Sequence, residues 1–140
     1  MYRLINGTQS EVKVPVQDML SMVPNKTQIE RQRVIRFSDC DPAGIVFYPQ
    51  YFVMFNGLVE DWFTSELKVN YYDLIGNRKV GLPTIRLEAD FKNISKMGEI
   101  VNLQLAVARL GRSSIALKIF CVGPDGQLRM SVDQYIVTTS

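Results

Sequence analysis

The chain has 140 residues, of which 46% are hydrophobic and 21% charged, a composition that fits one globular domain and leaves little room for two. Its formal net charge is only +2 and its Lys and Arg residues are scattered, so the sequence predicts no nucleic-acid partner. It contains no histidine, which excludes Ser-His-Asp and Cys-His triads, histidine general bases and histidine zinc sites. Acid–base or nucleophilic chemistry must therefore fall to Asp, Glu, Lys, Tyr, Cys, Ser or Thr.

The first 28 residues, 1–28, are predicted to form an N-terminal extension, and residues 29–140 to form one domain. Valines alternate with other residues over positions 12–16, as in a short strand, and positions 16–23 could form about two helical turns. The segment 24–27, PNKT, is typical of a linker. We expect the extension to pack on the domain rather than to form a domain of its own.

No segment is typical of a signal peptide or of a membrane helix. The longest apolar-rich run, Tyr48–Phe63, is interrupted by glycine and by polar and acidic side chains, so it cannot span a bilayer. Two cysteines, Cys40 and Cys121, are fewer than a secreted disulfide framework usually contains. The sequence predicts a reduced, cytoplasmic protein with no membrane partner.

A loosely alternating run over Ile29–Phe37 predicts the first strand of the domain. It leads into the segment Ser38–Phe52, SDCDPAGIVFYPQYF, whose first proline and glycine predict a tight turn that carries Asp39 and Asp41. Pro49 suits the first position of a helix, where its missing N–H costs nothing. A carboxylate, free backbone N–H groups at a helix start and an apolar pocket in one place indicate chemistry at a carbonyl group.

The predicted helix has a wide apolar and aromatic stripe, formed by residues spaced three and four apart: Tyr51, Phe52, Phe55, Leu58, Val59, Trp62 and Phe63. A stripe of this width predicts a helix buried on most sides, with Glu60 and Asp61 on a narrow polar face. Asn56 falls on the apolar face, where a buried amide needs a hydrogen-bond partner. Either a backbone group, or the acyl group or the thioester of a substrate, would supply one.

After a loop over residues 70–82, the hydrophobic period changes from about 3.6 to two. The strands predicted from this period cover residues 84–91, 101–107, 115–119 and 128–134. In the first of them, Ile85, Leu87, Ala89 and Phe91 form the predicted buried face. Short glycine-containing turns make neighbouring strands antiparallel. The predicted fold class is α+β, a curved antiparallel sheet wrapped around one long central helix, with the other face of the sheet solvated or covered by another subunit.

Three segments of the chain carry a resemblance to a known family: FSDCDPAGIVFYPQYF at 37–52, VGLPTI at 80–85 and GRSS at 111–114. Together they resemble the 4-hydroxybenzoyl-CoA thioesterase family of the hotdog fold, over roughly residues 32–137 and with the same order of elements. The first segment is the most specific of the three. The resemblance implies hydrolysis of an acyl-CoA, for which an aromatic acyl group such as 4-hydroxybenzoyl is a candidate, by a homodimer or homotetramer.

In that family, catalysis belongs to the second acid of the motif, which is Asp41 here, and the backbone N–H that matches Tyr48 polarises the thioester carbonyl. The chemistry alone leaves three roles open for Asp41: nucleophile that forms a mixed anhydride, general base for water, or simple turn residue. Asp39 is predicted to hold the loop or to tune Asp41. Cys40 is predicted to be a buried spectator, because its acidic neighbours would raise the pKa of its thiol.

Binding residues are predicted at two further places, besides the contact of Asn56 with the acyl group. The resemblance implies that Arg109 and Arg112 bind the phosphates of CoA, and ordinary surface charge is the alternative. Gly81 and Pro83 are predicted to shape the wall of the pocket. Coenzyme A is part of the substrate, and neither a cofactor nor a metal is expected, because thiolates leave readily without metal assistance.

Other functions fit parts of the pattern. A noncatalytic hotdog protein that binds acyl-CoA or a small aromatic ligand would keep the same pocket. A hotdog dehydratase or hydratase is disfavoured, because those related enzymes use a His together with a carboxylate. A sister group of hotdog thioesterases places its carboxylate on the central helix, but Glu60 and Asp61 are predicted to be solvated or paired across a subunit contact.

Overall fold

The computed structural model describes residues 27–139, so the predicted extension lies outside the described residues except for Thr27 and Gln28, which begin the first strand. The main elements are β1 (Thr27–Val34), α2 (Pro49–Asp61), β2 (Thr84–Phe91), β3 (Ile100–Leu110), β4 (Ser114–Val122) and β5 (Leu128–Val137). A 3-10 turn at Phe37–Asp39 and π-helical turns at Trp62–Glu66 and Asp73–Asn77 lie between them. The predicted order of one strand, one helix and four strands is confirmed.

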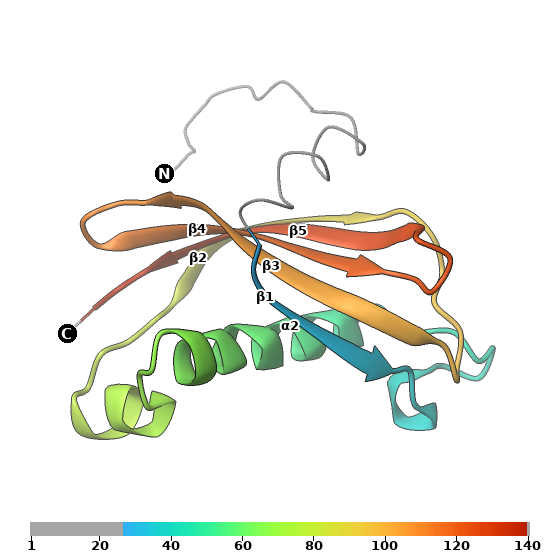
Figure 1. Cartoon of the computed structure of the whole chain (residues 1–140), viewed down its shortest axis with the longest axis horizontal. Coiled ribbons are helices and arrows are strands. Elements are labelled where there is room, and N and C mark those ends of the chain that lie inside the picture. The colour runs from blue at the N-terminus through green and yellow to red at the C-terminus, as the bar shows by residue number, and fades with distance from the viewer. Residues whose placement is uncertain (1–26, 140) are drawn as a thin grey trace.

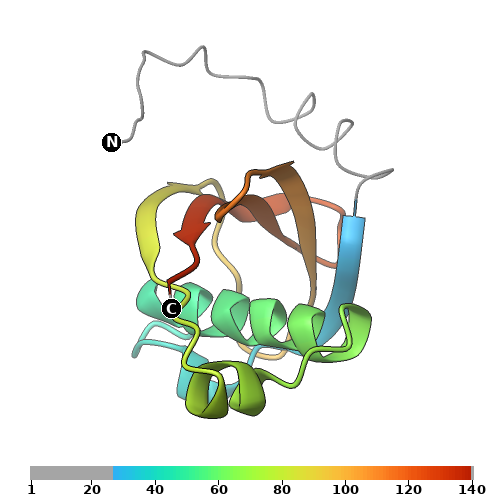
Figure 2. The ribbon, with the colours of Figure 1, turned by 90° about the vertical axis from the view of Figure 1, so that its left-hand side faces the viewer.

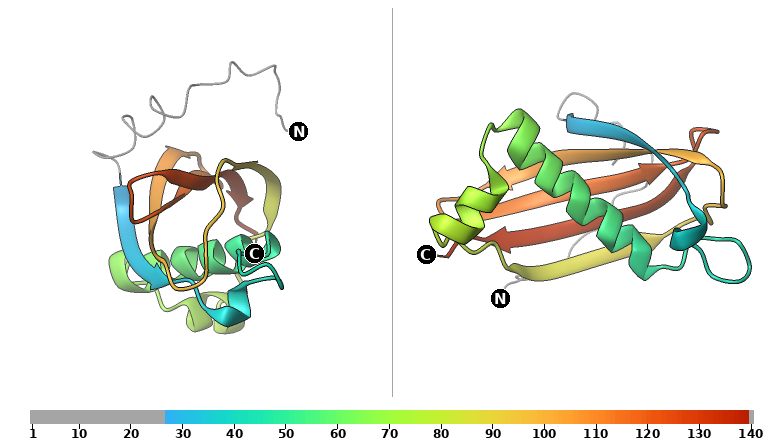
Figure 3. Two further views of the ribbon diagram at one scale, coloured as in Figure 1. Left: turned by 90° about the vertical axis from the view of Figure 1, so that its right-hand side faces the viewer. Right: turned by 90° about the horizontal axis from the view of Figure 1, so that it is seen from below.

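The described strands form one sheet in the order β1-β3-β4-β5-β2, and every neighbouring pair is antiparallel. The sheet curls around α2, which lies against its concave face (Figures 1 and 2). Seen from below, the helix runs obliquely across the strands (Figure 3). The predicted curved antiparallel sheet around one long helix is therefore confirmed. None of the described helices is long and apolar enough to cross a membrane.

The core lies between α2 and the central strands. The helix buries its residues Tyr51, Met54, Phe55, Leu58 and Val59. They pack against side chains of β3, β4 and β5 that are almost fully buried: Val101, Leu105, Leu117, Ile119, Met130 and Val132. The prediction of a helix buried on most sides is only partly right, because the side of α2 that carries Val53, Asn56 and Gly57 is exposed in the single chain.

The predicted buried face of β2 is wrong for a single chain. Ile85, Leu87 and Phe91 are all exposed, at 55%, 44% and 51%, and only Ala89 is half-buried. The reason is the position of β2 at one end of the sheet order, where α2 covers its inner face incompletely. Alternation in a sequence shows which side chains share a face, but not whether a neighbour covers that face.

β1 ends at Val34, three residues before the predicted end. The next residue, Ile35, still donates its N–H to the carbonyl of Glu99, at 2.8 Å, and the chain then turns sharply. The turn forms because the carboxylate of Asp39 accepts the N–H of Arg36, at 2.8 Å. This early turn brings the two-acid motif to the start of α2.

Candidate active site

Residues 39–47 form a small hairpin that joins the 3-10 turn to α2; we call its residues 40–47 the Asp41 loop. Cys40 and Val46 pair as an antiparallel bridge, and the N–H of Asp41 donates to the carbonyl of Ile45, at 2.9 Å. Gly44 adopts a φ of +79°, a conformation that favours glycine, while its N–H donates to the carbonyl of Asp41. The tight turn predicted from the sequence is confirmed.

Asp39 is the anchor of this hairpin, as predicted, and it is only 1% exposed. Arg33 donates to both of its carboxylate oxygens, at 2.6 and 3.0 Å, and the N–H of Arg36 and the side chain of Gln50 donate as well. Burial alone would raise the pKa of Asp39, but these hydrogen bonds and the charge of Arg33 outweigh it, so the pKa is lowered. Asp39 is therefore a charged structural residue, and each of its carboxylate oxygens accepts two hydrogen bonds.

Asp41 has very different surroundings. It is half-buried, and its Oδ1 accepts the N–H of Ala43, at 2.9 Å. Within residues 27–139 no donor contacts its Oδ2. One oxygen therefore orients the side chain within the turn, and the other keeps its lone pairs for a substrate or a water molecule.

Cys40 lies between the two acids, and its thiol contacts the carbonyl of Arg36, at 3.4 Å. Partial burial and the negative charges of Asp39 and Asp41 raise its pKa, so it stays a thiol at neutral pH. Cys121 is fully buried in the core, and burial raises its pKa to about 12. Both cysteines are free. The predicted burial of Cys40 is wrong, because its side chain is only half-buried, but its surroundings agree with a spectator role.

The start of α2 offers one backbone donor next to the hairpin. Tyr48 stands before Pro49, which has no N–H, and the next two amides donate to the carbonyls of Phe47 and Tyr48. The N–H of Tyr48 meets no acceptor in the part of the chain that the structure describes. An unpaired N–H at the positive end of a helix dipole can bind an oxygen that gains negative charge.

A pocket of about 340 Å³ opens beside the helix. It is lined by Phe52, Val53, Phe55, Asn56, Thr84, Leu87, Val132 and Gln134. The walls are mostly apolar, and three polar side chains interrupt them. Gln134 donates to the hydroxyl of Thr84, at 2.8 Å. Asn56 is exposed toward this space, so the prediction that its amide is buried is wrong, since β2 does not cover that side of α2.

The match with known protein families decides the class of this molecule. The family model described as "Thioesterase-like superfamily" matches residues 35–139, which include the Asp41 loop, α2 and the four strands that follow. The chain belongs to the thioesterase-like superfamily. The enzyme class predicted from the sequence, acyl-CoA thioesterase, is confirmed at the level of the family.

Relatives of this thioesterase are similar in sequence and in structure. The 4-hydroxybenzoyl-CoA thioesterase of Pseudomonas sp. (strain CBS-3) is 26% identical over 111 residues, which cover 76% of this chain and 79% of that protein. Its solved structure matches with a TM-score of 0.70, over 81% of this chain and 84% of that one. The hotdog fold is therefore confirmed.

Two further solved structures match this thioesterase over most of their length. A gentisyl-coenzyme A thioesterase is 25% identical, with a TM-score of 0.72 over 80% of this chain and 89% of that one. A 1,4-dihydroxy-2-naphthoyl-CoA thioesterase from Synechocystis is 20% identical, with a TM-score of 0.73 over 79% of this chain and 81% of that one. The second likeness is one of fold alone.

The remaining predicted residues of this thioesterase lie away from the Asp41 loop. Gly81 pairs with Thr139, and a side chain at position 81 would collide with the hydroxyl of Thr139. Pro83 accepts the N–H of Val137, at 3.1 Å, and neither residue is among those that line the pocket. Arg109 and Arg112 are exposed at the hairpin between β3 and β4.

One charged residue in the thioesterase core was not predicted from the sequence. Arg129 is 4% exposed, although it stands in an alternating strand where a charged residue normally faces solvent. Only the turn at 123–126 before it, with its two glycines, hinted at close packing of the backbone. Thr84 and Gln134 were also missed as pocket residues, since polar strand positions usually face water.

Proposed function

We propose that this thioesterase hydrolyses an aromatic acyl-CoA to the free acid and CoA, with Asp41 as nucleophile or general base. One observation carries the proposal. Among the described residues, the hairpin fixes Asp41 by one oxygen and leaves the other without a donor, and the residue that follows it directly, Tyr48, has an N–H without an acceptor. A basic oxygen and an oxyanion donor on one short segment are what thioester hydrolysis requires.

Two routes are compatible with these atoms. In the first, Oδ2 of Asp41 attacks the thioester carbonyl, the C–S bond breaks, the CoA thiolate takes a proton from solvent, and water then hydrolyses the mixed anhydride. In the second, Asp41 takes a proton from water while that water attacks the carbonyl, and the thiolate leaves directly. The same carboxylate oxygen acts in both routes.

In both routes, negative charge grows on the carbonyl oxygen, and we assign its stabilisation to the N–H of Tyr48. A single preorganised donor of this kind typically lowers the barrier by about 3 to 4 kcal/mol. The donor belongs to the backbone, so the side chain of Tyr48, which is 59% exposed, is not required for it. Pro49 has no N–H and cannot take over the task.

The pocket beside α2 supports an aromatic acyl group. Its volume of about 340 Å³ and its walls of aromatic and aliphatic side chains suit a flat ring. Asn56 would contribute an amide to a polar substituent of the ring, such as a hydroxyl, and the Thr84–Gln134 pair would do so from the opposite wall. The relatives act on ring-containing acyl groups by name, 4-hydroxybenzoyl and gentisyl, at 26% and 25% identity.

We assign the phosphates of CoA to Arg109 and Arg112, which are exposed on one hairpin and carry the planar donor forks that suit phosphate. Gly81 and Pro83, which do not line the pocket themselves, are proposed to shape its wall by placing Thr84, which follows Pro83 directly and does line it. No resident cofactor or metal is expected. The cytoplasmic location predicted from the sequence stays a prediction.

A second copy of the chain completes this proposal. β2 pairs only with β5 among the described residues, and one of its exposed apolar side chains, Leu87, lines the pocket together with the exposed Val53 of α2. An edge strand with apolar side chains is a ready surface for pairing with another strand. We propose that two chains join through β2, that the pocket is closed at this contact, and that a homodimer or a homotetramer results.

The Asp41→Asn substitution tests the proposal. Asn keeps the oxygen that accepts the N–H of Ala43 but removes the basic oxygen, so kcat/KM should fall about a thousandfold while the fold stays intact. A panel of aryl- and alkyl-CoA esters, followed by release of free thiol, measures this. Light scattering on the same samples reports the number of chains in each assembly.

Three outcomes contradict parts of the proposal. Turnover of the Asn variant at the rate of the wild type would remove Asp41 from catalysis. Binding of CoA esters without thiol release by the wild type would instead favour a noncatalytic acyl-CoA-binding protein. A monomer that hydrolyses aryl-CoA at full rate would exclude the second copy from the site.

A further inference from the structure

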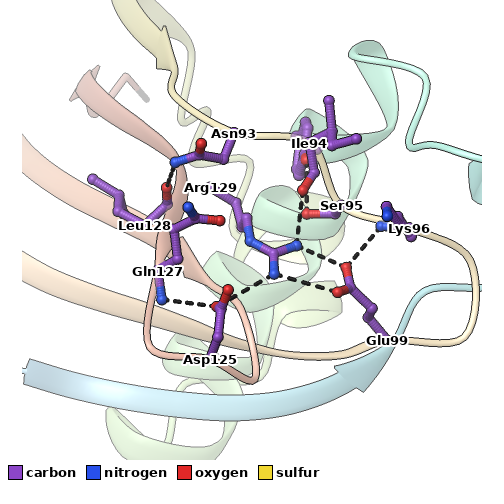
Figure 4. A network of polar contacts seen from close by, with 10 residues as sticks. Asn93, Ile94, Ser95, Lys96, Glu99, Asp125, Gln127, Leu128 and Arg129 are labelled. Atoms are coloured by element: carbon purple, nitrogen blue, oxygen red, sulfur yellow. Dashed lines mark hydrogen bonds and ion pairs between the residues drawn. The ribbon is translucent and has the colours of Figure 1, made fainter.

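A buried ionic cluster lies next to the Asp41 loop, and hydrolysis as proposed above does not use it. At its centre is Arg129 of β5, which is 4% exposed. Its Nη1 donates to Oε1 of Glu99, at 2.7 Å, and to the carbonyl of Ile94, at 2.8 Å. Its Nη2 contacts Oε2 of Glu99 and Oδ1 of Asp125, both at 3.3 Å (Figure 4).

The backbone is shaped to admit this guanidinium group. A side-chain carbon at Gly123 would collide with it, so only glycine leaves room at that position. The carbonyl of Arg129 also accepts two N–H groups, from Lys92 at 2.9 Å and from Asn93 at 3.1 Å. Arg129 therefore fixes the segment 92–99 by its side chain and by its backbone together.

This segment is the outer partner of the Asp41 loop. The N–H of Val46 donates to the carbonyl of Ser95, at 2.9 Å, and the N–H of Met97 donates to the carbonyl of Gly44, at 3.0 Å. Ile94, whose carbonyl Arg129 holds, directly precedes Ser95. The position of one edge of the loop is thus set by a segment that the arginine holds.

Further backbone hydrogen bonds connect this edge of the loop to Asp41. Val46 pairs with Cys40, the residue before Asp41, and the N–H of Asp41 donates to the carbonyl of Ile45. Arg129 itself does not contact Asp41. It can affect catalysis only through the placement of the loop, whereas a purely structural ion pair would affect folding and nothing else.

Burying a guanidinium group is costly, and an apolar side chain of similar volume often serves stability as well or better. What an apolar side chain cannot do is hold two carboxylates and one carbonyl in fixed directions, and the planar fork of arginine does this. From this geometry we infer that Arg129 and Glu99 are positioning residues for Asp41, which rests on the proposed thioesterase mechanism. They hold segment 94–97, and that segment holds the Asp41 loop in its reactive position.

The test compares kcat and KM in Arg129→Lys, Arg129→Met and Glu99→Gln, at a temperature where each variant is folded. A displacement of about 1 Å at a reacting group can cost about a hundredfold in rate. We expect kcat to fall about tenfold in Arg129→Lys and about a hundredfold in Arg129→Met, with KM changed less than about threefold. Glu99→Gln should lie near the Lys variant.

Two control variants separate positioning from loss of stability. Lys118→Met removes the ion pair with Asp133 between β4 and β5, at 2.6 Å, which touches neither the Asp41 loop nor segment 92–99. Ile119→Val removes a methylene group from the fully buried core of β4. Both should keep kcat within about twofold of the wild type.

Amide hydrogen exchange gives a readout that does not depend on turnover. In the Arg129 and Glu99 variants, the amides of Val46 and Met97 should exchange faster, whereas those of Gly81 and Thr139, paired at the far end of the sheet, should not. If the wild type hydrolyses no thioester, the proposed function fails and exchange alone decides whether Arg129 holds the loop.

Several outcomes would overturn the inference. One is a folded Arg129→Met variant with kcat within twofold of the wild type. Another is a change in KM alone, and a third is exchange that rises equally at Gly81 and Val46. Should Arg129→Met fail to fold, the Lys and Gln variants decide in the same way, because each keeps part of the hydrogen bonding. A normal kcat in both of those variants would then refute the inference even if Asp41→Asn is inactive.

Discussion

Two charged centres hold the Asp41 loop from opposite sides, and different parts of the chain build them. Asp39 takes its partners from Arg33, Arg36 and Gln50, which lie no more than eleven residues away in the sequence. Arg129 takes its closest contacts from Ile94 and Glu99, 35 and 30 residues away, and only the longer contact with Asp125 is local. One support is local and forms with the turn, whereas the other exists only once the sheet has assembled.

The comparison shows why Asp41 can keep a free oxygen. The acid two residues before it receives four hydrogen bonds, and the segment on the other side is fixed by a buried arginine. Asp41 therefore does not have to hold the loop itself. A single bond to Ala43 orients it, and its remaining oxygen can serve a reaction instead of the fold.

The largest expected effect comes from breaking the local support. Asp39→Asn removes the charge that pairs with Arg33 and places amide hydrogens against the N–H of Arg36 or the amide of Gln50. Removing one partner of a buried charged network leaves the others unsatisfied, so we expect a loss of about 3 kcal/mol in the free energy of unfolding. For a chain of this size, that corresponds to a fall in Tm of about 10 °C.

Asp41→Asn is the matched control for this stability measurement, because it makes the same chemical change two residues away. Its free energy of unfolding should stay within about 0.5 kcal/mol of the wild type, since Ala43 keeps its acceptor. Thermal unfolding followed by circular dichroism measures both variants. Equal losses of stability would show that Asp41 supports the fold as much as Asp39 does, so that Asp41 would not be free for a reaction.

The difference between the supports also explains what the sequence could predict. The turn, the helix start at Pro49 and the structural role of Asp39 follow from local patterns, because proline, glycine and a nearby acid act within a few residues. The sheet followed from alternation with period two. The burial of Arg129 could not be found in this way, since two of its partners, Ile94 and Glu99, reach it only in the folded sheet, and only Asp125 is close in the sequence.

The same distinction between local and tertiary structure applies to the residues of the candidate site. Asp41 and Tyr48 could be proposed from the motif and the resemblance, as both belong to one short segment. The pocket wall from Thr84 and Gln134 and the exposure of Asn56 depend on where β2 stands relative to α2. Position within the sheet is a tertiary property, and a burial pattern read from alternation does not contain it.

Acidification should weaken both supports, with a smaller effect than Asp39→Asn, because protonation keeps the carboxyl group in place. Burial favours the neutral form of Asp39, but hydrogen bonds from Arg33 and Arg36 outweigh it and hold its pKa below the ordinary 3.8. The hydrogen bonds from Arg129 and Lys96 hold the pKa of Glu99 below 4.5. A lowered pKa in the folded state stabilises the fold above the ordinary value, and this contribution is lost as the pH falls through the folded-state pKa.

Stability should therefore be nearly constant from pH 7 to about pH 5 and should fall below about pH 4. Urea unfolding at a series of pH values measures this. The profile of Asp39→Asn should be flatter than that of the wild type below pH 4, because one of the two titrating supports is gone. If the stability of Asp39→Asn falls as steeply below pH 4 as that of the wild type, Asp39 does not contribute to the loss of stability in acid.

The smallest expected effect concerns an uncharged hydrogen bond to segment 92–99, the segment that Arg129 holds. The hydroxyl of Tyr51 in α2 donates to the hydroxyl of Ser95, at 3.0 Å, and both residues are buried. Burial raises the pKa of Tyr51, so its hydroxyl is protonated and can donate at neutral pH. Tyr51→Phe or Ser95→Ala should each cost about 1 kcal/mol, since either leaves one buried hydroxyl without its partner.

The double variant tests whether these two hydroxyls act as a pair. Removing both partners leaves no unsatisfied group between them, so the double variant should be more stable than the sum of the single losses predicts, by about 1 kcal/mol. Additive losses in thermal unfolding would mean that the two hydroxyls act independently. A coupling energy of this size would be smaller than the loss of unfolding free energy in Asp39→Asn. The charged contacts of Asp39 would then stabilise the loop more than the neutral hydrogen bond between Tyr51 and Ser95 does on the side of segment 92–99.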